Sequence, residues 1–483
     1  MKRRNLRAVA VAAVGAMMVT SLAACGGTDG KNSTESGSNS DVTTLKWIQV
    51  GSGMPANYED WQKNINKYLG DKIGVNLDVE VISWGDWDNK RSAIINTNED
   101  YDILFTNSGT YASDVRLGAY YDISELVKSE TPDLYASIPE DYWNATKIDG
   151  KIYAVPTYKD SSATQYFVWD KALAEKYNID YENLTTLDAL TDGLTAMAEG
   201  EKTAPFVLNN NGLSAVTEKR YDALSLGLPA IGVSYDDSSK KVVSVFEQDD
   251  IMSDLKTLNK WYNAGIINAD AATLAENPSY RSCFVAQGWS LAAKTTWSGQ
   301  MGVDAAAVQW GDTVVSNDTV GGSLSCISAN CKNPEKALAL LELVNTDSYV
   351  RDALYYGLEG ENFEYTADKK VKKLNEDWTM AGYTQGTFFN VSQLDGEEVN
   401  QWDEVKELNE NAKPSPVLGV SIDPTNFSDE LANCTEIFNR YKSELLTGTK
   451  EPEAEVAAMM KEMRAAGFDK IIEEVQKQVD ASK

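Results

Sequence analysis

The sequence predicts an α/β fold, because segments with strand and helix patterns alternate along its first part. Residues 45–50 and 75–81 have the pattern of strands, and in the second of them Val and Leu alternate with Asn, Asp and Glu. Between them, residues 58–69 carry apolar side chains at helical spacing. A helical stretch at 90–95 leads to a third apolar strand at 101–105. Strands that alternate with helices are typical of parallel sheets built from βαβ units.

The pattern changes after residue 150. Residues 153–158 include Pro156, which forbids a helix there and favours an extended segment. Asn333, Pro334 and Glu335 have the residue types of a helix start, so a helix to Val344 is expected. The chain from Thr346 to Lys483 is predicted to be mostly helical. Further strands are expected at 165–169, 303–310 and 322–328, and further helices at 171–177, 186–198 and 249–264.

The composition excludes several functional classes. The chain has 483 residues with 44 Lys and Arg against 73 Asp and Glu, so its formal charge is -29. This charge argues against binding to nucleic acid and to anionic lipid surfaces. The chain contains no histidine, which excludes Ser-His-Asp and Cys-His catalysis and His-ligated zinc. A glycosidase that uses only carboxylates remains open.

The N-terminus has the pattern of an exported lipoprotein. Four basic residues precede an apolar run from Ala8 to Ala24, which predicts a signal peptide at 1–24. The run ends Leu-Ala-Ala-Cys-Gly and resembles the lipobox of bacterial lipoproteins, in which Cys25 becomes the lipidated first residue. Residues 25–44 then form a polar, flexible tether. The protein is expected on the outer face of the cytoplasmic membrane, and an uncleaved anchor is the alternative.

The remaining four cysteines are too few for a disulfide framework in a chain of this length. Cys326 and Cys331 could pair, and buried thiols are the alternative. No CxxC pair, EF-hand loop or phosphate-binding Gly-x4-Gly-Lys motif is present. No metal and no cofactor is therefore expected.

Several segments together resemble the extracellular solute-binding lipoproteins of ABC importers, in their oligosaccharide-binding branch. The segments that carry this resemblance are the lipobox at 22–25, 101–106 (Tyr-Asp-Ile-Leu-Phe-Thr), 149–156 (Asp-Gly-Lys-Ile-Tyr-Ala-Val-Pro), 328–337 and 356–360 (Tyr-Gly-Leu-Glu-Gly). Residues 430–441 and 466–470 resemble the helical C-terminal region of one subgroup. The order and spacing of these segments are more specific than any one of them.

The resemblance implies a two-lobed, class II periplasmic-binding-protein-like fold with the ligand between the lobes. The three hinge crossovers would lie near 153–158, 307–310 and 327–331. Lobe one would comprise 45–155 plus 309–327, and lobe two 156–308 plus 328–483. Three strands through a hinge allow two lobes to close without unfolding.

The candidate ligand-binding residues lie at strand ends, at the expected hinges or in Gly-rich loops. Open α/β sheets bind ligands at the carboxyl ends of their strands, and flat aromatic rings match the apolar faces of sugars. For each Trp the alternative is core packing, which is the prediction for Trp61 and Trp261 on their helical faces. The candidates are Trp84, Asp86, Trp87, Thr110, Tyr111, Tyr158, Lys159, Asp160, Trp289, Trp297, Trp310, Tyr356 and Glu359.

The favoured function is that of a non-enzymatic, monomeric receptor that captures an oligosaccharide and delivers it to the permease of an ABC importer. ATP would be hydrolysed by another subunit. The alternative is the same fold binding a peptide or another small polar solute, for which Arg351, Arg281 and Lys159 are the candidate counter-charges. The remote alternative is a carboxylate glycosidase.

Overall fold

A five-stranded sheet forms the base of what we call the first lobe. The computed structural model describes residues 42–97 and 99–482. The strand order is β2-β1-β3-β14-β6, and β1 runs parallel to both β2 and β3, as the alternating pattern predicts. β14 is antiparallel to its two neighbours. The strands are β1 (Thr43–Gly51), β2 (Val75–Ser83), β3 (Ile103–Thr106), β14 (Leu324–Ile327) and β6 (Ala154–Pro156).

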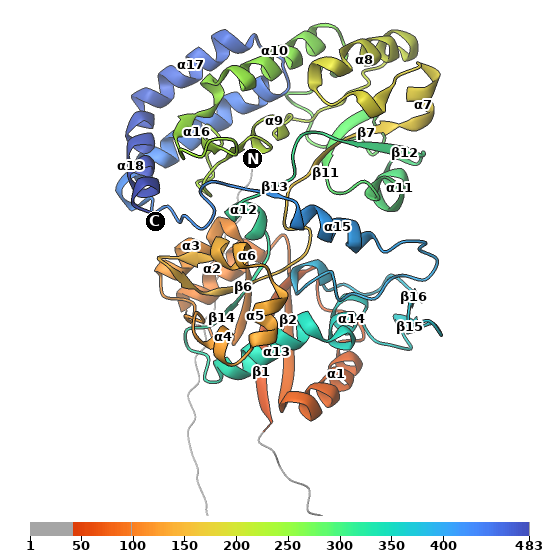
Figure 1. Cartoon of the computed structure of the whole chain (residues 1–483), viewed down its shortest axis with the longest axis vertical. Coiled ribbons are helices and arrows are strands. Elements are labelled where there is room, and N and C mark those ends of the chain that lie inside the picture. The colour runs from red at the N-terminus through yellow and green to blue at the C-terminus, as the bar shows by residue number, and fades with distance from the viewer. Residues whose placement is uncertain (1–41, 98, 483) are drawn as a thin grey trace, which may run out of the picture. The chain divides into compact units, whose positions relative to one another are not determined.

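Helices α1 (Tyr58–Ile73), α13 (Pro334–Thr346) and α14 (Ser348–Tyr356) pack on this sheet (Figure 1). Trp61, Ile65 and Leu69 recur at helical spacing and form the buried face of α1. The indole nitrogen of Trp61 donates to the carbonyl of Ala353 at 2.8 Å, which joins α1 to α14. The helix ends at Gly74, whose left-handed backbone (φ 64°) suits glycine. Trp61 is therefore a core residue, as predicted.

Short elements cover the rest of the first lobe. Helix α2 (Trp87–Thr97) follows β2, and α3 (Ser108–Arg116) follows β3. Asn107 caps α3 by accepting a hydrogen bond from the backbone nitrogen of Gly109. The remaining elements are α4 (Leu126–Ser129), α5 (Pro132–Ser137), α6 (Glu140–Ala145), β4 (Lys147–Ile148), β5 (Lys151–Ile152), β13 (Val314–Val315) and α12 (Asn317–Val320).

The second lobe is built on an antiparallel sheet of order β11-β7-β12. Its central strand, β7 (Gln165–Asp170), is buried along its whole length. The neighbouring strands are β11 (Cys283–Gln287) and β12 (Ala305–Gln309), and a second small sheet contains β8 (Tyr221–Asp222), β9 (Ile231–Ser234) and β10 (Val242–Ser244). The helices are α7 (Lys171–Lys176), α8 (Leu187–Glu201), α9 (Ala215–Glu218), α10 (Asp249–Asn263) and α11 (Ser298–Met301).

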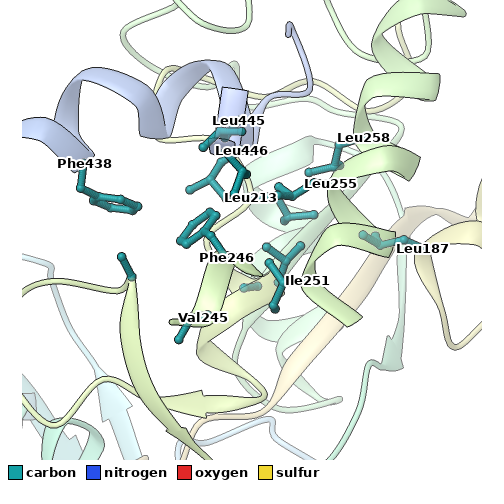
Figure 2. Close-up of a cluster of buried hydrophobic side chains, with 14 of the residues drawn as sticks. Leu187, Leu213, Val245, Phe246, Ile251, Leu255, Leu258, Phe438, Leu445 and Leu446 are labelled. Atoms are coloured by element: carbon teal, nitrogen blue, oxygen red, sulfur yellow. The ribbon is translucent and has the colours of Figure 1, made fainter. Parts of the chain in front are cut away.

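The C-terminal helices α16 (Ser428–Leu446), α17 (Pro452–Ala465) and α18 (Phe468–Ala481) complete the second lobe beside α10 (Figure 1). In Figure 2, Leu445 and Leu446 of α16 lie near Leu255 of α10, and Phe438 of α16 lies beside Phe246, with ring centroids 5.4 Å apart. Gly448 ends α16 where a Cβ atom would meet the backbone of Leu258 at 2.3 Å. This close approach requires glycine.

The predicted helical content after Thr346 is correct for α14 and for 428–481 but wrong for much of 357–427. This region holds three short strands, β15 (Phe363–Tyr365), β16 (Val371–Lys373) and β17 (Lys413–Pro414), one α-helix, α15 (Gln401–Glu410), two 3-10 turns and irregular backbone. Phe363, Val371 and Phe388 bury its apolar side chains in a separate small cluster. The apolar side chains of these short runs are therefore buried without a helix.

The predicted lobe boundaries and the third crossover need correction. Helices α13 and α14 bury Leu341 and Leu354 in the same cluster as Leu45 of β1, so residues 334–356 belong to the first lobe and not to the second. The chain first returns to the second lobe through α15 and β17 (Lys413–Pro414). The third crossover therefore lies at about 401–417 rather than at 327–331. The apolar face of a helix does not encode which of two cores it joins.

The crossovers are tied to one another by side-chain hydrogen bonds. Asn409 of α15 accepts from the backbone nitrogen and the hydroxyl of Ser162, at 3.1 and 2.8 Å. Its amide nitrogen donates to the carbonyl of Lys159 at 2.5 Å. β17 pairs in parallel with β13, next to the second crossover. The connecting segments thus form one hydrogen-bonded hinge region.

Two further predictions concern cysteines and membranes. Cys283, Cys326, Cys331 and Cys434 are buried free thiols, so Cys326 and Cys331 do not pair. Within residues 42–97 and 99–482, no helix has the length and apolar character needed to cross a bilayer. The predicted signal peptide (1–24) and the lipidation site Cys25 lie outside the described residues, as does most of the predicted tether (25–44).

Candidate ligand-binding site

A cavity of about 490 Å³ lies where the first crossover meets both lobes. We call it the hinge cavity. Its walls come from residues 159–165 of the first crossover, from 217–235 of the second lobe and from 316–322 around α12. Val320 of α12 belongs to the core of the first lobe, so both lobes contribute to the walls. Its volume is in the range of sites for small molecules.

The predicted residues Lys159 and Asp160 line the hinge cavity. The ammonium nitrogen of Lys159 lies 2.5 Å from a carboxylate oxygen of Asp160, and the two side chains are 17% and 35% exposed. The backbone nitrogen of Lys159 donates to the hydroxyl of Ser161, which fixes the turn after β6. The first crossover thus contributes an ion pair with no net charge to the wall of the cavity.

The second-lobe wall carries tyrosines and a carboxylate. The Tyr221 hydroxyl donates to Asp250 at 3.0 Å, and the buried Tyr235 lies beside Ser316 of the first lobe. Burial raises the pKa of Tyr235, and the carboxylates of Asp222, Asp318 and Glu218 raise it further. Burial also raises the pKa of Glu218, against a hydrogen bond with Ser214 that lowers it. The contribution of the three carboxylates to the raised pKa of Tyr235 places negative charge near its hydroxyl, whereas the shift at Glu218 reports burial.

Two exposed aromatic rings lie at the carboxyl edge of the first-lobe sheet. Trp84 directly follows β2, and both Trp84 and Tyr383 are 46% exposed. Their rings are nearly parallel, at 8°, with centroids 6.3 Å apart. The edge of Trp84 rests on Phe105 of β3. We call Trp84 and Tyr383 the aromatic pair; it offers flat apolar faces to solvent where an open α/β sheet binds ligands.

The segment that carries Tyr383 is anchored at the hinge. The carbonyl of Thr384 accepts from the hydroxyl of Ser323 at 2.9 Å, and Ser323 contacts the hydroxyl of Thr157 at 3.0 Å. Arg351 is fully buried and donates to the carbonyls of Gly382, Gly386 and Thr387. These contacts fix the loop on which one ring of the pair stands.

Most of the predicted aromatic candidates are buried by protein and do not offer a ring face. Trp87 packs on Phe105 inside the first lobe. Tyr158 is enclosed by Tyr142 and Phe389. The relative exposures of the buried candidates are Trp87 3%, Tyr158 5%, Trp297 6%, Trp310 1% and Tyr356 7%.

The remaining candidates lie apart from the hinge cavity. The Thr110 hydroxyl pairs with Thr106 at 3.0 Å. The Tyr111 hydroxyl donates to the carbonyl of Thr146 at 2.7 Å, and its ring lines a smaller cavity of about 160 Å³. Trp289 contacts Trp402 with ring centroids 5.7 Å apart. Glu359 is exposed and lines none of these cavities.

Trp310, a candidate at an expected hinge, is buried by contacts within the protein. One face stacks on Phe167 with centroids 4.8 Å apart, and the Lys219 ammonium lies 4.3 Å from the ring centroid. With both interactions in place the ring has no free face for a sugar. Trp310 is therefore a core residue of the second lobe, whose cluster also contains Trp261.

We expect Trp310→Ala to lower the free energy of unfolding by about 3–5 kcal/mol, because a large buried side chain is removed and a cavity is left. Trp84→Ala is expected to change it by less than about 0.5 kcal/mol, because that ring is exposed. Urea unfolding followed by circular dichroism measures both values. Equal midpoints for the two variants would contradict the assignment of Trp310 to the core.

The sequence analysis missed Tyr383, Tyr221 and Tyr235. Tyr383 stands in a single 3-10 turn, Gly382–Thr384, which is too short to give a periodic pattern. Tyr221 begins the short strand β8 and Tyr235 directly follows β9, two strands that the sequence pattern did not predict. Glycine and proline residues cluster at 227–232, which indicates a loop there. This loop is the feature of the sequence that could have pointed to a cavity wall.

Two family models match the chain. The model described as bacterial extracellular solute-binding protein matches residues 63–373. A second, described as a domain of unknown function (DUF3502), matches 416–483, the segment that returns to the second lobe. The chain therefore belongs to the bacterial extracellular solute-binding proteins, and its two-lobed α/β fold with a helical C-terminal region is the one predicted. The family's description places its members outside the cytoplasm.

The similar proteins include transport proteins of Streptococcus pneumoniae. A carbohydrate ABC transporter substrate-binding protein of serotype 4 is 30% identical over 501 residues, covering 99% of both chains. The crystal structure of an N-glycan transport solute binding protein matches with a TM-score of 0.81 and 28% identity, covering 91% of this chain and 98% of that one. The same protein in complex with Man5GlcNAc matches with a TM-score of 0.69, 28% identity and the same coverage.

Proposed function

We propose that this protein is the substrate-binding component of an ABC importer and captures an oligosaccharide between its lobes. The observation that carries the proposal is the similarity, over 91% of the chain, to a pneumococcal N-glycan transport protein solved with a bound oligosaccharide. The proposed binding surface is the hinge cavity together with the aromatic pair.

The chemistry of these surfaces suits a hydroxyl-rich ligand. Amide and hydroxyl groups of Gln165, Gln287 and Thr319 line the hinge cavity and can pair with sugar hydroxyls. Trp84 and Tyr383 offer rings to the apolar C–H faces of a sugar. Covering about 100 Å² of such a ring contributes roughly 2.5 kcal/mol before the costs of binding.

Binding between lobes couples capture to closure. A ligand that touches both lobes stabilises the closed arrangement, whereas a ligand that touches one lobe does not shift the equilibrium. The connections between the strands of the two lobes, 157–164 from β6 to β7 and 310–313 from β12 to β13, narrow the expected first and second crossovers. Together with the third at about 401–417, they are the segments in which backbone angles would change. The permease would then recognise the closed, loaded form.

We also propose three properties that the sequence predicts. The protein breaks no bond, acts as a monomer and is held on the outer face of the cytoplasmic membrane by lipid on Cys25. The absence of histidine supports a binding role. A charged solute fits less well, because Arg351 is buried against backbone carbonyls and Lys159 is paired with Asp160.

Titration calorimetry with a panel of neutral oligosaccharides, including Man5GlcNAc, tests the proposal. Trp84→Ala and Tyr383→Ala are each expected to weaken binding at least tenfold, because each removes one stacking face. Tyr280→Ala is the matched control, since Tyr280 is 44% exposed, donates to Asp170 of β7 in the second lobe and does not line the hinge cavity. Binding by none of the panel would overturn the proposed function. Unchanged affinity in both variants would remove the aromatic pair from the site.

A further inference from the structure

The hinge cavity holds an excess of negative charge. Three carboxylates line it, from Asp160, Glu218 and Asp318. The cation among its lining residues is Lys159, and its ammonium lies 2.5 Å from Asp160. Two carboxylates thus remain without a partner cation in the wall of the cavity.

These carboxylates come from separate elements that converge on one space. Asp160 stands on the first crossover, Glu218 ends α9 of the second lobe, and Asp318 lies on α12. One oxygen of Asp318 accepts from the hydroxyl of Ser225 at 2.7 Å, so this carboxylate is fixed between the lobes. The other polar side chains of the wall are amides and hydroxyls, such as Gln165 and Gln287.

The two cations that follow Glu218 along the chain, Lys219 and Arg220, are not among the residues that line the cavity. The Arg220 guanidinium pairs with Asp254 at 2.5 Å and approaches Asp250 at 3.6 Å. Lys219 lies over the ring of Trp310, 4.3 Å from its centroid. A further carboxylate, Asp222, is buried behind the wall, and burial together with Asp318 raises its pKa to about 6. Among the charged side chains that line the cavity, acids therefore outnumber bases by three to one.

We infer that the hinge cavity selects uncharged oligosaccharides and rejects those that bring a carboxylate, such as a uronic or sialic acid, into it. This inference rests on the proposed function. A ligand carboxylate would face Glu218 and Asp318 in a partly desolvated space, and placing like charges side by side is a common means of excluding a competing ligand.

Matched ligands separate charge from shape. The probes are Man5GlcNAc, its derivative oxidised at C6 of the terminal mannoses to carboxylates, and the corresponding carboxamide, which has nearly the same shape and no charge. Calorimetry is expected to give similar affinities for the parent and the carboxamide and at least tenfold weaker binding for the carboxylate. A carboxylate that binds within tenfold of the carboxamide overturns the inference and leaves the proposed function intact. If no neutral oligosaccharide of the panel binds, the proposed function is overturned instead.

Variants that remove the charge of one carboxylate test whether the cavity residues cause the preference for the uncharged ligand. Glu218→Gln and Asp318→Asn keep the shape and a hydrogen-bond acceptor at each position, and each is expected to reduce the carboxamide-to-carboxylate affinity ratio at least threefold. Glu359→Gln removes one exposed carboxylate outside the cavity and is expected to leave the ratio unchanged. Thermal unfolding of each variant checks that the fold is kept. An equal reduction in all three variants would assign the effect to net charge and overturn the inference.

Discussion

A chain that ends at Ser415 is expected to lose its folded second lobe. The removed segment supplies sixteen buried apolar side chains to the main cluster of that lobe, among them Phe427, Phe438, Met463 and Phe468. Its loss returns the facing residues of α10 and of the preceding 3-10 turn, including Phe246 and Leu255, to water (Figure 2). At about 1.5–3 kcal/mol for each large apolar side chain, exposing six such residues costs on the order of 10 kcal/mol. That is comparable with the whole stability of a typical domain.

Thermal unfolding and limited proteolysis measure this effect. The truncated chain is expected to lack the cooperative transition of the second lobe and to be digested there, while the first-lobe cluster retains Leu45, Trp61 and Leu341. A chain that ends at Ala481, the last residue of α18, is the control and should unfold like the full chain. A truncated chain with an unchanged transition temperature would show that residues 416–483 are an appendage rather than part of the core.

The locally encoded parts of the fold were predictable from the sequence. The alternation at 75–81 and the helical spacing at 58–69 each specify a buried face without reference to distant residues. The Asn333-Pro334-Glu335 start of α13 is equally local, and the helix begins at Pro334 as expected. These elements were assigned correctly because their burial pattern is contained in a single window of sequence.

The assignment of elements to lobes was not predictable in this way. Leu338 and Leu341 of α13 and Leu255 of α10 have the same kind of apolar spacing, yet the first two join one core and the third the other. Which core a helix joins depends on the path of the chain, and the chain returns to the second lobe only after 357–400, where the regular elements are β15, β16 and one 3-10 turn. The position of the third crossover was wrong for this reason.

The hinge residues of the candidate site could be predicted from the sequence, whereas the exposure of its aromatic residues could not. Lys159 and Asp160 follow a proline-containing strand, and that position alone indicates a crossover. Trp84 and Trp87 have similar surroundings in the sequence, but Trp84 lies in the turn before α2 and Trp87 is its first helical residue. The side chain of Trp84 therefore reaches solvent at 46% exposure, while Trp87 is 3% exposed. A difference of one turn in the start of a helix decides which ring is available.

Arg351→Ala is expected to cause a large loss of stability for a single substitution. The side chain is fully buried without a carboxylate partner. Its Nε atom donates to the carbonyl of Thr387 at 2.6 Å, and one terminal nitrogen donates to Gly382 at 2.7 Å and Gly386 at 3.2 Å. Removing it leaves the carbonyls of Gly386 and Thr387 without their donor, each at about 1–3 kcal/mol, and opens a cavity, while the Gly382 carbonyl keeps the backbone nitrogen of Gln385 at 3.4 Å. We expect the free energy of unfolding to fall by about 5 kcal/mol.

The matched control is Arg440→Ala, in which an exposed guanidinium loses a surface ion pair with Glu462 and the effect should stay below about 1 kcal/mol. Equal losses in urea unfolding for the two variants would contradict the role given to Arg351. Arg351→Lys extends the test to function, because an ammonium group cannot span the three carbonyls that a planar guanidinium joins. Since those carbonyls belong to the loop that carries Tyr383, this variant should weaken oligosaccharide binding as Tyr383→Ala does, even under conditions where the protein remains folded.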